Sequence, residues 1–334
     1  MGARLLVIGS TNVDLFVTVP RHPSPGETLI GSGGDRAAGG KGANQALAAA
    51  LQGTEVTFVG AVGDDPDAQT ALAGLREAGV DLTDVETAPG TTTGLAIITV
   101  SEDGENTIVV VPGANATLAG ATAVAAVEAM ATDDILLMQG EIPRETTQAA
   151  VRAARGSGRR VVLNVAPWMA LDHDVLTAAD PLVLNEHEAA LAVRELGLTP
   201  EDDGASSTAR ALCGAGTPSV VITLGAEGAV VATGPDTVVS WPSPRVTAVD
   251  STGAGDAFTG ALAARLLEGE GLESAVRHAV RVAAYAVQHP GAQPSYPGVG
   301  DALPAAGAGR NSAAPGSGPR KDRVLAGQQV GDGP

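Results

Sequence analysis

The stretch Ala248-Val249-Asp250-Ser251-Thr252-Gly253-Ala254-Gly255-Asp256-Ala257-Phe258 leads from an apolar, strand-like run through a glycine-rich turn into a helix. The turn Gly253-Ala254-Gly255 leaves backbone N–H groups at the helix start free to bind an anion, and an oligophosphate is the natural ligand. A carboxylate repels phosphate, so we interpret Asp256 as the base that takes a proton from an attacking hydroxyl. The stretch therefore predicts phosphoryl transfer to an alcohol. Its simpler interpretation, a glycine C-cap followed by an Asp N-cap, stays open at this point.

The composition is that of a globular protein large enough to bury a sizeable core, with 334 residues of which 44% are hydrophobic. A formal net charge of -18 repels nucleic acid and anionic membranes, so we expect neither as a partner. The single cysteine, Cys213, excludes an intrachain disulfide and fits a reducing compartment. Residues 1–10 lack the pattern of a signal peptide, and no apolar run approaches the roughly 20 residues that span a membrane. We expect a cytoplasmic protein.

Strand-like and helix-like segments alternate along most of the chain. Short apolar runs predict buried strands at residues 5–9, 56–60, 135–138, 161–164, 182–184, 219–223 and 229–232. Apolar residues at helical spacing predict helices ending at Leu51, at residues 67–78, 118–130, 145–155 and 273–288, and after Gly255. This alternation predicts one α/β domain over residues 1–300, with a doubly wound, mostly parallel sheet flanked by helices.

Two further regions predict a smaller sheet. Residues 13–19 alternate between apolar and polar side chains, which is typical of a half-exposed strand. Residues 94–100 and 106–111 also have strand character, and the Asp-Gly pair between them indicates a hairpin. We expect strands from about 13–36 and 94–111 to form a lid that excludes water from the site. Residues 301–334 are rich in Gly, Ala and Pro and predict a low-complexity, disordered tail.

Polar side chains follow the first predicted strand. Asn12 and Asp14 lie two residues apart, so in an extended chain they share one face and offer partners for adjacent sugar hydroxyls, although an Asx turn is the simpler interpretation. The segment Ala38-Gly39-Gly40-Lys41-Gly42-Ala43-Asn44-Gln45-Ala46 is not a P-loop, because the Walker pattern fails at its first glycine and at its hydroxyl residue. No G-x-G-x-x-G follows a strand, which removes the main support for a dinucleotide enzyme. We expect Lys41 and Asn44 to contact the hydroxyls of a small molecule.

Two carboxylates come directly after predicted strands. Glu141 follows the strand at 135–138, and Glu188 lies at the head of a helix. Glu188 either complements the helix dipole or holds Mg2+ through water molecules beside a phosphate group, since that ion keeps most of its hydration shell. Glycines in the turn Leu224-Gly225-Ala226-Glu227-Gly228 leave room for a flat adenine or its ribose.

Six motifs, in this order and spacing, resemble those of the PfkB carbohydrate kinase family. They are Asn12-Val13-Asp14, Pro25-Gly26-Glu27-Thr28, Gly39-Gly40-Lys41-Gly42-Ala43-Asn44-Gln45-Ala46, Asn185-x-x-Glu188, Asp250-Ser251-Thr252-Gly253-Ala254-Gly255-Asp256 and Gly291-Ala292-Gln293-Pro294-Ser295. The likeness runs from about Leu5 to Pro297. The two glycine-rich motifs are specific for the family, and the unbroken Gly-Gly-Lys-Gly-Ala-Asn-Gln and Gly-Ala-Gln-Pro-Ser narrow it to members that phosphorylate ribose.

The resemblance implies a role for each matching position. A sugar would be held by Asn12, Asp14, Gly40, Lys41, Gly42, Asn44 and Glu141, with Asp256 as the base and Gly253, Ala254 and Gly255 as the anion hole. ATP would contact Asn185, Thr223, Leu224, Gly225, Ala226, Glu227, Gly228, Gly255 and Val280, the last of which replaces a histidine common in the family. Mg2+ would lie at Glu188, and a monovalent cation such as K+ at Asp250, Thr252, Ala286, His289, Gly291 and Ser295. Family members commonly form homodimers through the lid strands.

The implied reaction transfers the terminal phosphoryl group of ATP to the 5-hydroxyl of D-ribose, giving D-ribose 5-phosphate and ADP. One alternative is a kinase for deoxyribose, fructose or a nucleoside such as adenosine. A second is a sugar-binding regulator without catalysis, although a mere binder does not need the base at Asp256. A sequence departure also stands out, because the Gly- and Ala-rich tail replaces the usual last helix of the family.

Overall fold

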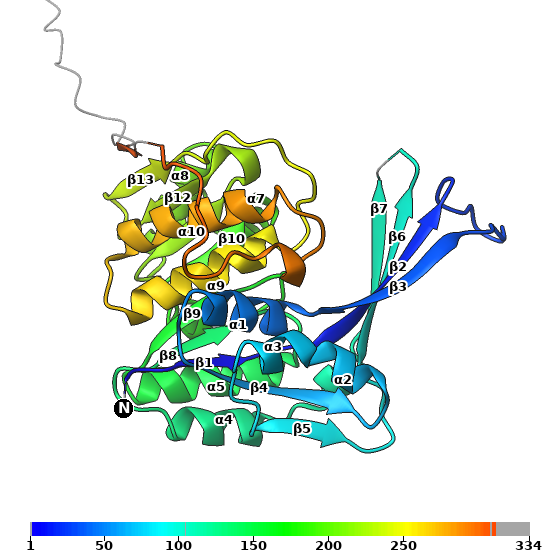
Figure 1. The fold of residues 1–334 in the computed structure, drawn as a ribbon. Coiled ribbons are helices and arrows are strands. Elements are labelled where there is room, and N and C mark those ends of the chain that lie inside the picture. Colours follow the sequence, from blue (N-terminus) through cyan, green and yellow to red (C-terminus); the bar gives the residue numbers. More distant parts are fainter. Residues whose placement is uncertain (1, 104, 308, 312–334) are drawn as a thin grey trace, which may run out of the picture.

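A large sheet forms the centre of the molecule in the computed structural model, which describes residues 2–103, 105–307 and 309–311 (Figure 1). Within these residues the sheet has ten strands. In the order in which they lie side by side they are β14 (Arg310–Asn311), β13 (Val238–Trp241), β12 (Ala229–Ala232), β11 (Val220–Thr223), β10 (Leu182–Asn185), β9 (Arg160–Asn164), β8 (Ile135–Met138), β1 (Leu5–Ile8), β4 (Val56–Gly63) and β5 (Val85–Ala88). Neighbours from β11 to β5 are parallel, and those from β11 to β14 are antiparallel. The predicted doubly wound, mostly parallel sheet is confirmed.

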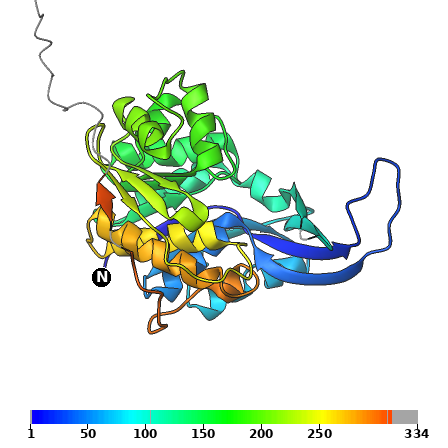
Figure 2. The same ribbon diagram turned by 90° about the horizontal axis from the view of Figure 1, so that it is seen from above.

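Helices cover both faces of this sheet (Figures 1 and 2). The core on one face includes residues of α1 (Lys41–Leu51), α2 (Asp67–Ala71), α3 (Ala73–Glu77), α9 (Ala254–Leu267) and α10 (Leu272–Ala286). The core on the other face includes residues of α4 (Gly120–Glu128), α5 (Arg144–Gly156), α6 (His173–Leu176), α7 (Glu186–Glu195) and α8 (Ala205–Gly214). Short 3-10 helices lie at Gly113–Thr117, Gly225–Glu227 and Gln293–Ser295.

The central strand β1 shows why its apolar run forms a strand with no polar face. Leu5 and Val7 belong to the core on one side of the sheet, whereas Leu6 and Ile8 belong to the core on the other. Successive side chains of a strand point to opposite faces, so a strand covered by helices on both sides must be apolar throughout. The polar residues that follow β1 are thereby delivered to the carboxyl end of the sheet, where ligands of such folds bind.

A second, four-stranded sheet extends from the body (Figure 1). Its strands lie in the order β3 (Ser32–Gly39), β2 (Asn12–Val19), β6 (Gly94–Ser101) and β7 (Asn106–Val111). The predicted hairpin between β6 and β7 is confirmed, and β2 pairs with β6 in parallel and with β3 antiparallel. β7 differs from the half-exposed strand that its sequence predicted, because all six of its residues are exposed. β7 pairs with β6 on one side only, and an exposed, largely apolar strand at a sheet edge is unusual for an isolated chain.

Two sequence predictions need correction. The single helix expected over 67–78 is divided at Leu72, whose φ and ψ of -100° and -1° depart from helical values. The tail expected to be disordered from residue 301 has structure where it begins, since the Arg281 side chain donates hydrogen bonds to the carbonyls of Leu303 and Pro304 and β14 pairs with the open edge of β13. Residues 312–334 of that tail lie outside the described residues. Among the helices described, none is long and apolar enough to cross a membrane.

Candidate active site

The glycine-rich turn of the sequence forms the start of α9. Gly253 is the N-cap with a left-handed φ of 73°, and a Cβ at this position would lie 2.7 Å from the Cβ of Ala292, so only glycine fits. A Cβ at Gly255 would meet nothing within 4 Å, which shows that this side of the turn is open. The Ala254 N–H of this fourteen-residue helix donates to the Ser251 carbonyl (3.2 Å), whereas the backbone at Gly255 is accessible from the open side.

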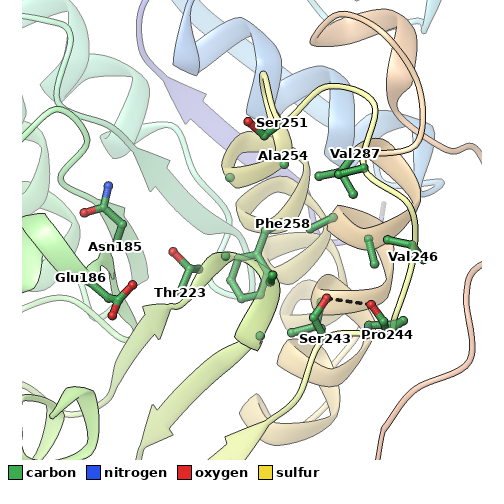
Figure 3. A pocket seen from close by; sticks show the side chains of 18 of the residues that line it. Asn185, Glu186, Thr223, Ser243, Pro244, Val246, Ser251, Ala254, Phe258 and Val287 are labelled. Carbon is green, nitrogen blue, oxygen red and sulfur yellow. Dashed lines mark hydrogen bonds between the residues drawn. The ribbon is translucent and has the colours of Figure 1, made fainter. Parts of the chain in front are cut away.

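A cavity of roughly 800 Å³ opens at this helix start (Figure 3). Its volume lies in the range of cofactor and small-molecule sites. Of the residues predicted to contact ATP, those that line it are Asn185, Thr223, Gly225, Ala226, Gly228, Gly255 and Val280, and Ala254 of the predicted anion hole lines it too. Two others do not, because Leu224 packs against the core and Glu227 is exposed to solvent. The remaining wall comes mainly from segment 243–248 and from the last turns of α10.

Glu188 lies in a capping box at the start of α7. The Asn185 side chain accepts a hydrogen bond from the Glu188 N–H (2.8 Å), and Glu188 Oε2 accepts one from the Asn185 N–H (2.9 Å). Glu188 therefore stands in the first turn of α7, the position that the helix-dipole interpretation requires. Burial raises the pKa of this carboxyl above its usual value. Among the described residues, no cluster of three His, Cys, Asp or Glu side chains is arranged to hold a metal ion.

Asp256 is buried, with 6% of its surface exposed, and each of its carboxylate oxygens accepts an amide hydrogen bond. Asn44 Nδ2 donates to Oδ2 (3.0 Å), and Gln45 Nε2 donates to Oδ1 (2.9 Å). A second shell of amides orients these two donors: Gln293 donates to Asn44, and Gln139 donates to Gln45. Both donors stand on α1, so the Lys41–Leu51 helix fixes the direction of the carboxylate.

The sugar-site residues predicted from the sequence gather on the other side of Asp256. Asp14 lies against Gly39, where a Cβ would come within 2.3 Å of the carboxylate. Glu141 Oε2 accepts hydrogen bonds from Ser10 Oγ (2.6 Å) and from the backbone N–H of Lys41 (2.9 Å). The backbone of Gly40, with φ of 88°, passes so close to β2 that a Cβ would clash with it. The turn between β3 and α1 thus brings its own backbone close to the carboxylates of Asp14 and Glu141.

A second cavity of roughly 350 Å³ adjoins this group. Asn12 and Glu141 line it, together with Asn115, whose Nδ2 donates to Asn12 Oδ1 (2.8 Å). Its remaining lining is largely apolar: Val110, Pro112, Ala116, Gly140, Ile142, Pro143 and Pro167. Val110 belongs to β7, so the small sheet contributes to the wall of the cavity. The side chains of Asp14, Lys41 and Asn44 do not line it.

Charges of both signs are concentrated here. Burial, and then the repulsion of Glu141 and Asp256, raises the pKa of Asp14 from 3.8 to about 6, against the attraction of Lys41. The attraction of Asp256, and to a smaller degree of Glu141, raises the pKa of Lys41 despite its burial. Lys41 is thus a cation whose charge is attracted by several carboxylates, and groups with such displaced pKa values are typical of functional sites.

The residues predicted to bind a monovalent cation fall into three hydrogen-bonded groups. Asp250 accepts the backbone N–H groups of Thr252 (2.9 Å) and Gly291 (2.8 Å), and although burial opposes it, these bonds lower the pKa of Asp250. The Ala286 carbonyl accepts from the His289 N–H, and the Ser295 hydroxyl donates to the Ala292 carbonyl. The set offers oxygen atoms, which are the ligands that hard cations prefer.

Sequence reasoning assigned no role to several amides that the structure places at the site: Gln45, Asn115, Gln139, Asn164 and Gln293. Gln139 and Asn164 end or follow β8 and β9, so the strand-end rule that selected Glu141 would have found them too. Gln45 and Gln293 stand inside quoted motifs, but a helical or loop amide gives no sign of which carboxylate it will meet.

A nucleotide-sized cavity at a helix N-terminus, beside a buried carboxylate held by amides, is the arrangement of an α/β phosphoryl-transfer enzyme. Comparison with known proteins gives the family. The model of the pfkB family carbohydrate kinases matches residues 3–298. The chain belongs to the PfkB carbohydrate kinase family and is a phosphotransferase.

Relatives within the family extend this result. The ribokinase of Bacillus subtilis (strain 168) is 39% identical over 88% of this chain and 96% of its own length. A deoxyribokinase of Salmonella typhimurium is 36% identical, again over 88% of this chain and 96% of its own. The structure of Arabidopsis thaliana ribokinase complexed with ribose and ATP superimposes with a TM-score of 0.78 and 31% identity, covering 89% of this chain and 96% of that one.

Proposed function

We propose that this enzyme phosphorylates D-ribose at its 5-hydroxyl with ATP, giving D-ribose 5-phosphate and ADP. The observation that carries the proposal is the position of Asp256, one residue beyond the open face of Gly255 and next to the cluster of Asp14, Lys41 and Glu141. The relatives named ribokinase, one of them solved with ribose and ATP, support the same substrates.

In this proposal Asp256 takes the proton from the 5-hydroxyl as its oxygen attacks the terminal phosphorus of ATP, and ADP leaves on the opposite side. The backbone N–H groups of Gly253, Ala254 and Gly255 stabilise the negative charge on the transferring group. The amides of Asn44 and Gln45 hold the carboxylate in a fixed direction, so its remaining lone pairs face the substrate.

In this proposal both side chains and backbone groups of the sugar-binding residues contact the sugar. Asn12, Asp14 and Glu141 offer acceptors for sugar hydroxyls, and Lys41 and Asn44 offer donors. Gly40 and Gly42 permit the backbone to approach the ring, since a Cβ on either would strike residues 9–12. A buried set of partners rejects an analogue that lacks the matching hydroxyl, often by orders of magnitude.

ATP would occupy the larger cavity, with its phosphates at the start of α9. Val280 and the glycines of the β11–β12 turn would contact the adenine by shape and apolar surface. Mg2+, when bound, neutralises charge on the phosphates, and Glu188 would hold it through water. A monovalent cation such as K+ would be held by Asp250, Thr252, Ala286, His289, Gly291 and Ser295, and would fix the loop behind the anion hole.

We also propose a cytoplasmic homodimer joined through the lid strands. Four consecutive apolar side chains of the edge strand β7, Ile108–Val111, are 43–60% exposed, and pairing with a second copy would cover them. Replacing Val109 by Lys is expected to convert the dimer into a monomer in size-exclusion chromatography with light scattering. A monomeric parent protein would contradict the proposal.

The activity is tested by measuring ADP formation with a panel of D-ribose, 2-deoxy-D-ribose, D-fructose, adenosine and inosine, first in potassium and then in sodium buffer. We expect the highest kcat/KM with D-ribose and faster turnover in potassium. The relative named deoxyribokinase makes 2-deoxy-D-ribose the second candidate, and a higher kcat/KM for that sugar would replace ribose with it. Turnover of nucleosides but not of free ribose would indicate a nucleoside kinase, and sugar binding without ADP formation a non-catalytic binder.

A further inference from the structure

Asn115 forms a buried hydrogen-bonded pair with Asn12, one of the residues predicted to hold the sugar. Both side chains are 2% exposed, and Asn115 Nδ2 donates to Asn12 Oδ1 (2.8 Å). Asn115 lies in the 3-10 helix Gly113–Thr117, which directly follows the lid strand β7. It therefore contacts the sugar end of the site from a segment in which the sequence predicted no site residue.

The orientation of the Asn115 amide is fixed by backbone groups. Its Oδ1 accepts a hydrogen bond from the Thr11 N–H (3.0 Å), and its Nδ2 donates to the Thr11 carbonyl (3.1 Å). A backbone N–H only donates and a carbonyl only accepts, so exchanging the oxygen and the nitrogen of this amide would break both bonds. The atom of Asn12 that meets Asn115 Nδ2 is consequently its oxygen.

This arrangement leaves the nitrogen of the Asn12 amide for a ligand. Asn12 Oδ1 already accepts one hydrogen bond, whereas Nδ2 has no acceptor among residues 2–103, 105–307 and 309–311. Asn12 lines the cavity of roughly 350 Å³, together with Asn115 and Glu141. An amide nitrogen at such a cavity donates to a hydroxyl oxygen, which an ionised carboxylate cannot do.

Gly94 leaves the room that the amide pair needs. It is the first residue of β6 and is the partner of Asn12 in the parallel pairing with β2. A Cβ at Gly94 would lie 2.1 Å from Asn12 Oδ1 and 2.4 Å from Asn115 Nδ2. The φ of Gly94 is not in the left-handed region, so the backbone conformation does not require glycine here, whereas the two amides do.

We propose that Asn115 is a positioning residue for sugar binding, which takes up the Asn12 oxygen and thereby turns Asn12 Nδ2 toward a hydroxyl of the substrate. The inference rests on the proposed function and deepens it. A sugar hydroxyl both donates and accepts, so one that lies between Asn12 Nδ2 and a carboxylate of the site finds a partner for each role. A sugar without that hydroxyl leaves the amide donor unpaired and binds more weakly.

The test is Asn115→Asp, which keeps the size of the side chain and the acceptor for the Thr11 N–H but removes the donor. Asn12 should then rotate its amide to donate to the carboxylate, which turns its oxygen toward the cavity. Calorimetry measures the Kd for D-ribose and for three analogues that each lack one hydroxyl, at carbon 1, 2 or 3. We expect the Kd for ribose to rise about tenfold or more. The ratio of the Kd of analogue and ribose should fall by a similar factor for one analogue and stay within about twofold for the other two.

Two comparisons separate positioning from a general loss of structure. The Kd for ADP should stay within about twofold in Asn115→Asp, because neither Asn115 nor Asn12 lines the nucleotide cavity. Gln148→Glu is the matched control, since Gln148 is also a buried amide that accepts a backbone N–H, and it should leave all these values unchanged. An equal loss of affinity for ribose and for all three analogues, or no loss for any of them, would overturn the inference.

A second variant decides the question should Asn115→Asp fail to fold. Asn12→Asp keeps the acceptor for Asn115 Nδ2 and replaces only the nitrogen. We expect a rise of about tenfold or more in the Kd for ribose, and a fall in the Kd ratio for one analogue only. If Asn12 instead met the sugar with its oxygen, this variant would keep that acceptor. A Kd for ribose within about twofold of the wild type would therefore refute the inference.

A measurement without ligand separates this inference from the proposed function. Both hydrogens of Asn115 Nδ2 are engaged, one by the Thr11 carbonyl and one by Asn12 Oδ1. In the 15N spectrum of the wild type, they should exchange with water more slowly than those of Asn12 Nδ2. Equal rates, or faster exchange at Asn115, would contradict the assigned orientation. Should the wild type bind none of the sugars, the proposed function fails, while the exchange rates still decide the role of Asn115.

Discussion

The two ends of the active site are lined by different kinds of chemical groups. The nucleotide cavity is lined mainly by glycine, alanine, valine and backbone, with Val280 on one wall and the open turn of Gly255 on another. The sugar end consists of buried ionisable and amide side chains, among them Asp14, Asn44 and Asp256. One end therefore recognises its ligand by shape and by fixed backbone dipoles, and the other by side-chain chemistry.

The difference has an energetic consequence. Apolar walls and helix N–H groups stabilise the fold or leave it unaffected, whereas burying like charges opposes folding. The pKa of Asp14, raised from 3.8 to about 6, corresponds to about 3 kcal/mol of folding free energy that is lost when the folded protein ionises. Removing the buried carboxylate of Asp14 should therefore change substrate binding and stability in opposite directions, and substitutions at the nucleotide end should not.

The largest effect is expected from Asp256→Asn, which keeps the size of the side chain and removes the base. We expect kcat to fall by at least about 10²-fold, while ribose still binds. Coupled ADP release gives kcat, and calorimetry gives the Kd for ribose. Asp84→Asn, an exposed carboxylate, is the matched control and should leave both values unchanged. A variant that keeps most of its turnover would show that Asp256 is not the base.

Asp14→Asn should show the opposed effects most clearly. Asp14 of the wild type takes up a proton below about pH 6 and loses an acceptor for a sugar hydroxyl, so the Kd for ribose should rise as pH falls through this value. At pH 7.5 the Kd of the variant for ribose should be larger than that of the wild type by about tenfold or more, which corresponds to the loss of about one charged hydrogen bond. The Kd of the variant should also be independent of pH between 5 and 7.5. A pH dependence retained in the variant would assign the titration to another group.

The pH dependence of the stability of Asp14→Asn follows from the same raised pKa. Because the folded-state value lies above the unfolded one, the unfolded chain releases the proton first, and ionisation destabilises the fold fully above pH 6 and not at all below pH 3.8. The variant should be more stable than the wild type at pH 7.5, by up to about 3 kcal/mol, with the difference vanishing near pH 4. Urea unfolding at the two pH values measures it.

Gln45→Met tests the positioning of the base and should have a smaller effect. The side chain keeps its length but loses the donor to Asp256, so we expect kcat to fall about tenfold, the worth of one charged hydrogen bond. Gln148→Met is the matched control, because Gln148 is also a buried amide but accepts from the Asp172 N–H far from the site. Both variants should lose stability, and only the first should lose kcat. Equal kinetics in the two would remove Gln45 from the mechanism.

The same contrast explains what the sequence could predict. The buried strands could be predicted because continuous apolar runs such as residues 135–138 leave no solvent-exposed face. The helix start at Gly253 could be predicted because only glycine fits at that position. The amides around Asp256 could not be predicted, because their contacts depend on how α1 lies against the ends of β8 and β9. No local sequence pattern contains that information. The residue composition of the tail likewise gave no sign that the Arg281 side chain would donate hydrogen bonds to the carbonyls of residues 303–304.

The nucleotide end shows a related limit. Val276, Ala279, Val280, Ala283 and Val287 form one apolar stripe along the predicted helix, and an apolar stripe normally indicates core. In the structure Val276 and Ala279 lie only in the core, Val280 belongs to the core and also lines the cavity, and Ala283 and Val287 line the cavity. Periodicity tells which face of a helix avoids water, but a ligand removes water as effectively as another helix does. The difference between core and binding site is therefore tertiary information.

The smallest effect is expected from Val280→Ala, which removes two methyl groups from the wall of the cavity. The KM for ATP should rise about fivefold, less than the loss for full burial of those groups, with kcat unchanged. Val282→Ala is the matched control, because Val282 is 1% exposed on the same helix and packs only in the core, so it should lower Tm without changing KM. Because the Val280 side chain does not titrate, the ratio of the KM values of variant and wild type should be equal at pH 6 and pH 8. A ratio that changes with pH would mean that the nucleotide end also depends on a charged side chain, and the contrast between the two ends would not hold.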